Sequence, residues 1–351
     1  MIRHKSQQNT TLRRLTAPLF AVLGMAVLAG CAPSDDETLN IYSARQEALI
    51  KPLLDRFTEE SGIEVNLLTA RAGALLSRLE NEGRNTPADV LITVDAGNLH
   101  QARQAGVLQP LHSDALHAAI PETYRDPDNH WYGLSQRARV FFTHRDRVEE
   151  GAISTYADLT DPRWEDRICI RSSENVYNQS LVASLIAHEG EEATEAWANG
   201  LVDNMARSPQ GGDRDQLRAV AAGECDLAVA NTYYYGAMLN GSEADRAVAE
   251  SLRLIWPNQA DRGTHVNISG AGMVAASDKE DLVREFIEFL AREDSQEWYA
   301  RVNNEHPVRP GVAMSETLAE WGEFKADDLN LATLGELNAA AVRLMDRAGW
   351  R

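Results

Sequence analysis

Three consecutive tyrosines, Tyr233, Tyr234 and Tyr235, follow the apolar segment Cys225 to Asn231, whose residues predict a strand. Successive side chains of an extended chain point to opposite faces, so three phenols in a row cannot all enter one core. At least one of them is therefore expected to face a cleft. A phenolate oxygen is a hard anionic ligand, and tyrosine ligates iron in some haem proteins. Aromatic packing or a sugar-stacking surface would use the same residue types.

The acidity of a phenol decides which metal ion it can ligate. A free tyrosine has a pKa of about 10, so ligation at neutral pH requires the metal to displace a proton. A trivalent ion does this far better than Ca²⁺ or Mg²⁺ because its charge is higher. The tyrosine cluster therefore points to ferric iron.

Two further loops hold candidate oxygen donors at the same edge. Ligands of open α/β sheets lie outside the carboxyl ends of the strands. Tyr177 lies in the loop that follows a predicted strand over 167–173, and Gln46 and Glu47 follow a predicted strand over 39–44. These side chains and the tyrosine run are expected to share one rim.

The elements that position these residues alternate between strands and helices from Leu39 onward. Short apolar runs predict the strands, and leucines at three- and four-residue spacing predict the helices between them. The predicted elements of this first block are strands at 39–44, 63–70 and 88–94 and helices at 46–61, through Leu75 to Leu79, and at 96–105. This βαβαβα order is typical of a parallel sheet covered by helices.

A second alternating block begins beyond the strand predicted over 134–144, which is a candidate hinge. Its predicted elements are strands at 167–173 and 225–231 and helices at 180–188, 191–202 and one ending at 222. Residues 265–276 predict a second crossing strand, and Ser277 with Glu280 predicts a capping box for a helix over 281–292. The expected fold class is α/β, with two lobes that are each a mostly parallel sheet with helices on both faces, joined by two hinge strands.

The first thirty residues predict export from the cytoplasm. Four basic residues precede an apolar run over 15–30, which is short for a membrane span and typical of a secretory signal. The run ends in Leu28-Ala29-Gly30-Cys31, which looks like a bacterial lipobox. We therefore expect residues 1–30 to be a lipoprotein signal peptide, Cys31 to carry a lipid anchor in the periplasm, and residues 31–38 to be a tether. The alternative is an ordinary signal peptide with an incidental cysteine.

Cys169 and Cys225 are the two remaining cysteines. An oxidising compartment permits a disulfide between them. Their spacing does not decide between a disulfide and two buried thiols, and both alternatives stay open at this point.

Charge and motifs exclude several classes of function. The formal net charge is −19, and no stretch beyond the leader concentrates basic residues, so a surface that neutralises nucleic-acid phosphates is not expected. Residues 270–275 fit a dinucleotide pattern only superficially, because the following helix begins too late. No HExxH, GxSxG or Walker motif occurs. The chain is therefore not expected to be an enzyme.

Several segments together resemble the ferric ion-binding proteins of bacterial ABC importers. They are YSAR (Tyr42 to Arg45), PADVLITVDAGNL (Pro87 to Leu99), CIRSSENVYNQSLVASLI (Cys169 to Ile186), AVAAGECDLAVANTYYYG (Ala219 to Gly236) and GTHVNISGAG (Gly263 to Gly272). The similarity covers most of the chain from Leu39 to Val312. It implies a two-lobed periplasmic binding protein of type II.

The resemblance also implies a ligand set. It assigns Fe(III) coordination to Tyr177, Tyr233 and Tyr234, with Tyr235 packed. Many members carry a His-Tyr pair where this chain has Gln46-Glu47. Glu47, Gln46, water or a small synergistic anion such as carbonate remain the alternatives for the other coordination positions.

The resemblance further places an arginine near the metal or its companion anion. Arg137 and Arg139 lie two residues apart on the predicted hinge strand and so share a face. Arg137 is the preferred candidate, and the alternative for either residue is a salt bridge between lobes. Ser172 and Ser173, at a strand end before a helix, are candidates for binding the anion through backbone N–H groups.

The expected function is capture of Fe(III) between the lobes and delivery to an ABC permease and ATPase complex by a monomer that touches the membrane through its lipid anchor. We expect one lobe to comprise residues 39–136 and 264–315 and the other residues 137–263 and 316–351. The alternatives are a binding protein for an oxyanion, polyamine or sugar, and a sensory lipoprotein.

Overall fold

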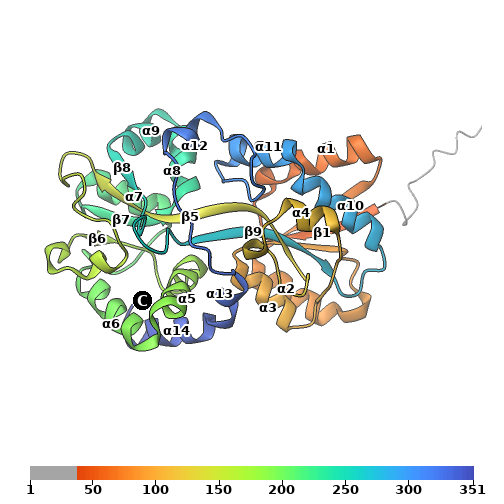
Figure 1. Ribbon diagram of the computed structural model, residues 1–351, viewed down its shortest axis with the longest axis horizontal. Helices are drawn as coiled ribbons and strands as arrows, with labels where there is room; N and C mark the ends of the chain where they lie inside the picture. Colours follow the sequence, from red (N-terminus) through yellow and green to blue (C-terminus); the bar gives the residue numbers. More distant parts are fainter. Residues whose placement is uncertain (1–37) are drawn as a thin grey trace, which may run out of the picture.

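The computed structural model of the protein describes residues 38–351 and consists of two lobes side by side along its long axis (Figure 1). The predicted signal peptide, Cys31 and the tether up to residue 37 lie outside the described residues. Within residues 38–351, no helix is both long and apolar enough to cross a membrane.

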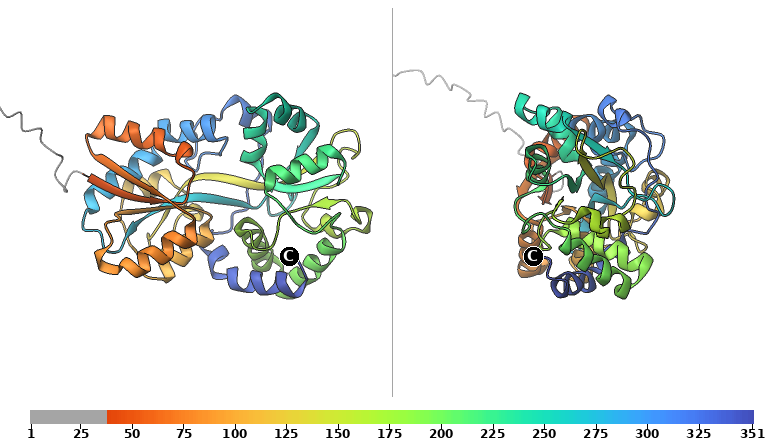
Figure 2. Two further views of the ribbon diagram at one scale, coloured as in Figure 1. Left: turned by 180° about the vertical axis from the view of Figure 1, so that it is seen from behind. Right: turned by 90° about the vertical axis from the view of Figure 1, so that its left-hand side faces the viewer.

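The first lobe is built on a parallel sheet. Strand β1 (Thr38–Ser43) pairs in parallel with β2 (Glu64–Thr69) on one side and with β3 (Val90–Val94) on the other. The helices of this lobe are α1 (Lys51–Ser61), α2 (Ala72–Glu82), α3 (Ala96–Gln104), α4 (Asp114–Ala119), α10 (Glu280–Ala291) and α11 (Glu293–Asn303). Figure 2 shows them on both faces of the sheet, as expected.

Two strands pass from one lobe to the other. Strand β5 (Tyr132–His144) pairs with β9 (Val266–Val274) over residues 132–138, and then with β7 from Arg139 onward. Both pairings are antiparallel, and β9 also runs antiparallel to β3. The expected hinge strands are therefore present, and the sheet turns from parallel to antiparallel where they cross.

The second lobe has a smaller sheet. Strand β7 (Leu227–Asn231) lies between β6 (Ile168–Cys169), which is parallel to it, and the antiparallel β5, whose other neighbour is β8 (Leu252–Ile255). The helices that follow these strands are α5 (Val176–Glu189), α6 (Glu191–Asp203), α7 (Asp213–Ala222), α8 (Thr232–Leu239) and α9 (Glu243–Glu250).

The C-terminal segment belongs to both lobes. Helix α14 (Asn338–Arg347) packs on α5 and α6, whereas α13 (Ala332–Glu336) packs on α3 of the first lobe and on α5 of the second. The short α12 (Glu316–Glu320) packs on α11. Our division of the chain at residues 136 and 315 stays an interpretation, since β5 and α13 each contact both lobes.

Both tyrosine-bearing segments are more helical than the sequence pattern indicated. Helix α5 begins at Val176, because the Asn175 side chain caps it by accepting a hydrogen bond from Tyr177 N at 3.2 Å. Helix α8 begins directly after β7, so Tyr233 to Tyr235 lie in its first turn and are not extended. The extended-chain reason for splitting the tyrosines was therefore wrong, although consecutive helical side chains also diverge.

The predicted capping box is also wrong. Helix α10 begins after Lys279, without a side-chain cap. Ser277 Oγ instead donates to Asp89 Oδ1 at 2.7 Å, because the serine lies beside β3 and not at the helix end.

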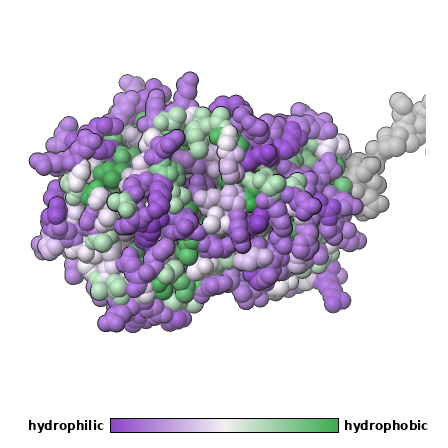
Figure 3. Space-filling view, in the orientation of Figure 1, coloured by the Kyte–Doolittle hydropathy of each residue, from purple (hydrophilic) through white to green (hydrophobic). Residues whose placement is uncertain are grey.

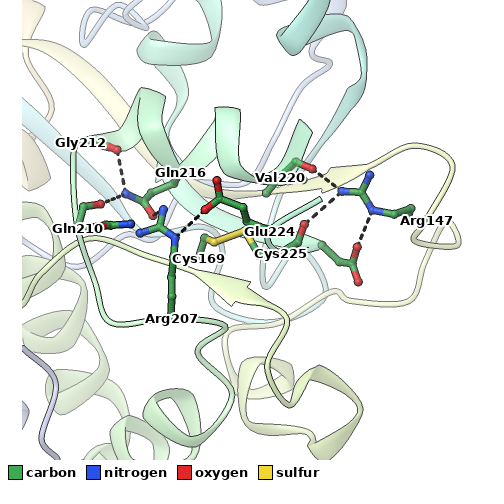
Figure 4. Close-up of a disulfide and its surroundings, with 10 residues drawn as sticks. Arg147, Cys169, Arg207, Gln210, Gly212, Gln216, Val220, Glu224 and Cys225 are labelled. Atoms are coloured by element: carbon green, nitrogen blue, oxygen red, sulfur yellow. Dashed lines mark hydrogen bonds and ion pairs between the residues drawn. A yellow bond between two sulfur atoms is a disulfide. The ribbon is translucent and has the colours of Figure 1, made fainter. Parts of the chain in front are cut away.

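A disulfide joins Cys169 and Cys225, whose Cα atoms are 5.9 Å apart, within the usual range (Figure 4). Cys169 ends β6, and Cys225 lies two residues before β7. The bond therefore ties together the two strands that lead to Tyr177 and to Tyr233.

The face shown in Figure 3 is mostly hydrophilic, with small scattered apolar patches. The exposed large apolar side chains among residues 38–351 are Val302, Met314 and Val342. Such scattered exposure is ordinary for the surface of a globular protein.

We expect loss of the disulfide to lower stability. The double variant Cys169→Ala/Cys225→Ala should lose about 2–4 kcal/mol in the free energy of unfolding, since the bond closes a long loop in the unfolded chain. Urea titration measures this. A reducing agent should bring the parent protein to the same midpoint and leave the variant unchanged; equal midpoints for oxidised parent and variant would contradict the bond.

Candidate metal centre

Three phenols converge where the second lobe meets the crossing strands. The hydroxyl oxygens of Tyr177 and Tyr233 are 3.2 Å apart, and the rings of Tyr233 and Tyr234 lie 4.2 Å apart at an angle of 32°. All three side chains are partly exposed, whereas Tyr235 is buried against Phe142. The structure thus brings together the three residues assigned to Fe(III) and packs the fourth tyrosine away.

Arg139 fixes the two helices that carry the tyrosines. Its Nε and Nη2 donate to Asn178 Oδ1 at 3.0 and 2.5 Å, and its Nη1 donates to Asn231 Oδ1 at 3.0 Å. Asn178 follows Tyr177 in α5, and Asn231 immediately precedes α8. One buried guanidinium on β5 therefore sets the relative position of both tyrosine turns.

Arg139 is consequently a poor candidate for binding an anion. Each of its three guanidinium nitrogens already donates to protein oxygens, including Asp213 Oδ2 at 3.5 Å and the Val229 carbonyl at 3.4 Å. The sequence placed Arg137 and Arg139 together on one strand face, but could not show that only one of them has its nitrogens occupied.

Asp213 and Asn178 are two residues that the sequence analysis missed. Asp213 is buried and accepts from the backbone N–H of Asn231 at 3.3 Å, while Arg171 Nη1 lies 3.9 Å from its other oxygen. Asn178 Nδ2 donates to the carbonyl of Ser172 at 3.0 Å and so holds the loop before α5. A charged residue opening a helix after Gly211-Gly212 was the available signal for Asp213.

Arg137 lies beside the tyrosines and is held by a buried carboxylate. Its Nη2 donates to Glu305 Oε1 at 2.9 Å and to Ser269 Oγ. The other oxygen of Glu305 accepts from Arg45 Nη2 at 2.7 Å and from Ser135 Oγ at 2.9 Å. The two arginines and the carboxylate form a network with one excess positive charge, in which Glu305 links the first lobe to the hinge.

The guanidinium of Arg137 lies over the ring of Tyr233. Its guanidinium carbon is 5.8 Å from the ring centre of Tyr233, and its Nε and Nη1 are buried without a hydrogen-bond partner among the described residues. A buried cation at this distance favours ionisation of a nearby phenol. These two nitrogens carry N–H groups that are available to a small anion.

Two further arginines border the cluster. The guanidinium of Arg171 lies 5.8 Å from the ring centre of Tyr177, and that of Arg214 lies 6.0 Å from the ring centre of Tyr234. Neither was singled out from the sequence. Their charges favour negatively charged ligands at this edge.

Burial of Tyr177 and Tyr233 keeps these two phenols protonated without metal, because it raises the pKa of each well above the usual value. The mutual repulsion of the tyrosine charges adds to the effect, whereas Arg137 opposes it. The Tyr177–Tyr233 hydrogen bond agrees with protonated phenols. An ion that binds here must displace these protons, which requires a high charge density.

The other predicted residues lie at the margin of the site. Gln46 and Glu47 are exposed, and Glu47 opens a 3₁₀ turn between β1 and α1. Ser172 Oγ accepts from the N–H of Glu174 at 3.2 Å, and the Ser173 carbonyl accepts from a side-chain amide. Coordination by Gln46 or Glu47 and anion binding by Ser172 or Ser173 stay predictions.

The donor set fits a hard, highly charged cation. A hard ion bound at about 2.0–2.1 Å holds neighbouring octahedral oxygens roughly 2.9 Å apart, close to the 3.2 Å between the Tyr177 and Tyr233 hydroxyls. Among residues 38–351, no three His, Cys, Asp or Glu side chains gather in a way that could hold a metal.

Two lobes, two crossing strands and a ligand site beside the crossing define a solute-binding protein of the two-lobed type. A family model described as bacterial extracellular solute-binding protein matches residues 85–328, and the chain belongs to this family.

Relatives with known names cover nearly the whole chain. Iron uptake protein A1 of Synechocystis sp. is 44% identical over 341 residues, which span 94% of this chain and 95% of that protein. A Trichodesmium protein, IdiA or FutA, solved in complex with iron and citrate ligands, matches with a TM-score of 0.87 and 44% identity, over 90% of this chain and 100% of that one. Mannheimia haemolytica ferric iron-binding protein A in an open conformation matches with a TM-score of 0.85 and 40% identity, over 90% and 99%. These matches confirm the resemblance and the two-lobed fold expected from the sequence.

We expect removal of the Glu305 charge to destabilise the fold. The variant Glu305→Gln leaves Arg45 and Arg137 buried without their counter-charge, which should cost about 3–5 kcal/mol. Although burial by itself raises the pKa of Glu305, the two arginines lower it to about 2. The Glu305 carboxylate is therefore charged at neutral pH.

Chemical denaturation measures this loss, and Glu293→Gln, an exposed glutamate of α11, is the control, which should change stability by less than about 0.5 kcal/mol. The depressed pKa of Glu305 also gives a sign: its stabilising contribution is full above the unfolded value of 4.5 and is lost as pH falls through about 2. Equal losses in the two variants would show that the network does not stabilise the fold.

Proposed function

We propose that this protein captures Fe(III) between its two lobes through Tyr177, Tyr233 and Tyr234 and delivers it to an ABC permease and ATPase. The observation that carries the proposal is the convergence of three partly exposed phenols beside a buried arginine. Three phenolates neutralise a trivalent ion and would leave a divalent ion with a net negative charge. The trivalent ion is therefore the better match.

The relatives support the same ion. Their printed names are iron uptake and ferric iron-binding proteins, and one was solved with iron and citrate. None of these names describes an enzyme, which agrees with a role in binding and delivery. We extend the iron ligand to this chain on the basis of its own tyrosines.

Three phenolates leave part of an octahedral shell open. We propose that an oxygen anion, such as carbonate or a carboxylate, takes these positions and binds the free N–H groups of Arg137, with Arg171 and Arg214 adding positive charge. This arrangement does not need Gln46 or Glu47 as ligands, which agrees with their exposure.

The lobes would close about β5 and β9. Because Arg45 and Glu305 connect the first lobe to Arg137, closure would change the position of Arg137 at the metal site. Bending of the two crossing strands would then present a different surface to the permease. We retain the periplasmic location, the anchor at Cys31 and the monomeric state as part of this proposal.

A visible absorption band tests the site. Ferric citrate added to the purified protein should produce a broad phenolate-to-iron charge-transfer band, and Tyr233→Phe or Tyr234→Phe should remove or strongly weaken it. Absorption titration measures both band and affinity.

The matched controls are Tyr235→Phe, which changes a packed tyrosine of the same helix turn, and Glu47→Gln. Both should keep the band. If the parent protein shows neither band nor retained iron, the solute is not ferric iron, and oxyanions or polyamines become the candidates. Loss of the band in Glu47→Gln would assign that carboxylate to the coordination shell.

Iron binding should release protons. Because burial raises the pKa of Tyr177 and Tyr233, these phenols are protonated before binding, and affinity should fall as pH falls. Calorimetry in buffers of different ionisation enthalpy measures the proton count. With one ferric source, Tyr177→Phe should release about one proton fewer per iron than the parent; an unchanged count would remove Tyr177 from the ligands.

A further inference from the structure

Asp95 is a fully buried carboxylate that the metal site does not use. It lies between β3 and α3 of the first lobe, at the point where that lobe meets the second. A buried carboxylate is costly unless its oxygens are fully hydrogen-bonded. Its partners therefore indicate what it does.

The partners of Asp95 come from three different parts of the fold. Oδ1 accepts from Gly97 N at 2.8 Å in its own helix, and Oδ2 accepts from Asn267 Nδ2 at 2.8 Å on the crossing strand β9. The hydroxyl of Ser180, on α5 of the second lobe, lies 2.8 and 2.9 Å from the two oxygens. One side chain thus joins the first lobe, the hinge and the second lobe.

The backbone of Asp95 is held in an unusual conformation. Its φ is 76° and its ψ is 127°, which a residue with a side chain rarely adopts. Its N–H donates to the Ile268 carbonyl on β9 at 2.8 Å, and Asn267 Oδ1 accepts from the next N–H, that of Ala96, at 2.8 Å. Such strain persists only where several contacts impose it. The hinge strand therefore determines where the carboxylate points.

Ser180 is close to the metal site along the same helix. It follows Tyr177 by three residues, so both lie on one face of the first turns of α5. A contact at Ser180 therefore restrains the turn that carries Tyr177.

Two C-terminal helices, α13 and α14, contact the helices that lie at this junction. Gly335 of α13 lies so near α3 that an added Cβ would be 2.2 Å from the Cβ of His100. Asn338, at the start of α14, donates to Gln179 Oε1 of α5 at 3.2 Å. Asp95 and Ser180 are both fully buried, so their contact is shielded from water.

We propose that Asp95 and Ser180 form an interlobe latch that fixes the Tyr177 turn relative to the first lobe and slows the release of bound metal. Asp95 is then a positioning residue, because it acts on the ligand through Ser180 and α5. The effect on metal release rests on the proposed function, whereas the latch itself rests on the contacts around Asp95.

The charges around the latch agree with a carboxylate that accepts hydrogen bonds at neutral pH. Burial raises the pKa of Asp95 to about 6, while the Ser180 and Gly97 hydrogen bonds and the charges of Arg137 and Arg139 oppose this rise. Above pH 6 both oxygens are acceptors, as the four contacts require.

The test compares two serines of one helix. Ser180→Ala removes the latch, and Ser184→Ala is the matched control, because Ser184 is equally buried on α5 but donates to Asp327. In the iron-free protein, hydrogen exchange of a peptide over 176–183 should be faster in Ser180→Ala than in Ser184→Ala. In the iron-loaded protein, loss of the visible band to an excess of EDTA should be about tenfold faster in Ser180→Ala than in the parent.

A second variant keeps every polar group. Gly97→Ala would place a Cβ 3.0 Å from Asp95 Oδ1, so it should shift the carboxylate by a few tenths of an ångström and change exchange and release in the same direction, by a smaller amount. It also decides the question if Ser180→Ala does not fold.

The outcomes separate the latch from the proposed function. Equal exchange and equal release rates in Ser180→Ala and Ser184→Ala, or parental behaviour in Gly97→Ala, would overturn the latch. Absence of the band in the parent would overturn the iron site alone, since exchange in the iron-free protein still tests the latch.

Discussion

The position of the three tyrosines of the candidate metal centre depends on one buried guanidinium, that of Arg139. The guanidinium donates to Asn178 and Asn231, the side chains next to the two tyrosine turns. Because Arg139 lies on a crossing strand, the tyrosines are held in position relative to the hinge and not only relative to their own lobe. The disulfide adds a covalent restraint to the same two segments farther from the site.

The remaining buried charges connect this centre to the first lobe. Arg137 forms an ion pair with Glu305, and Glu305 also forms an ion pair with Arg45, just after β1. A carboxylate shared by two arginines leaves one excess positive charge, which suits a cluster of phenols that must lose protons to bind metal. On the other side of the crossing, Asp95 makes a similar connection through neutral donors. The two lobes are thus joined by polar contacts whose hydrogen bonds form only when both lobes are in the arrangement described.

Much of the fold could be predicted from local sequence, and so could the residues of the candidate metal centre. Strands and helices have periodicities that a sequence displays, and both crossing strands were found in this way. Tyr177, Tyr233 and Tyr234 were identified by residue type, position after a strand and family resemblance. The starts of α5 and α8 were not predicted. The signal for a helix start, such as the Asn175 cap, spans only a few residues and is easily outweighed by the strand propensity of the residues around it.

The sequence by itself determined the α/β order, the family and the chemical character of the candidate ligands, because these follow from residue types and short-range spacing. Only the tertiary structure decided which arginine faces the phenols, and it revealed Glu305, Asp213 and Asp95 as partners of the site and the hinge. The physical reason is that the role of a buried charge depends on the groups that pack against it in space. For Glu305 and Arg45 those groups are 260 residues apart in the chain, and no local pattern records their meeting.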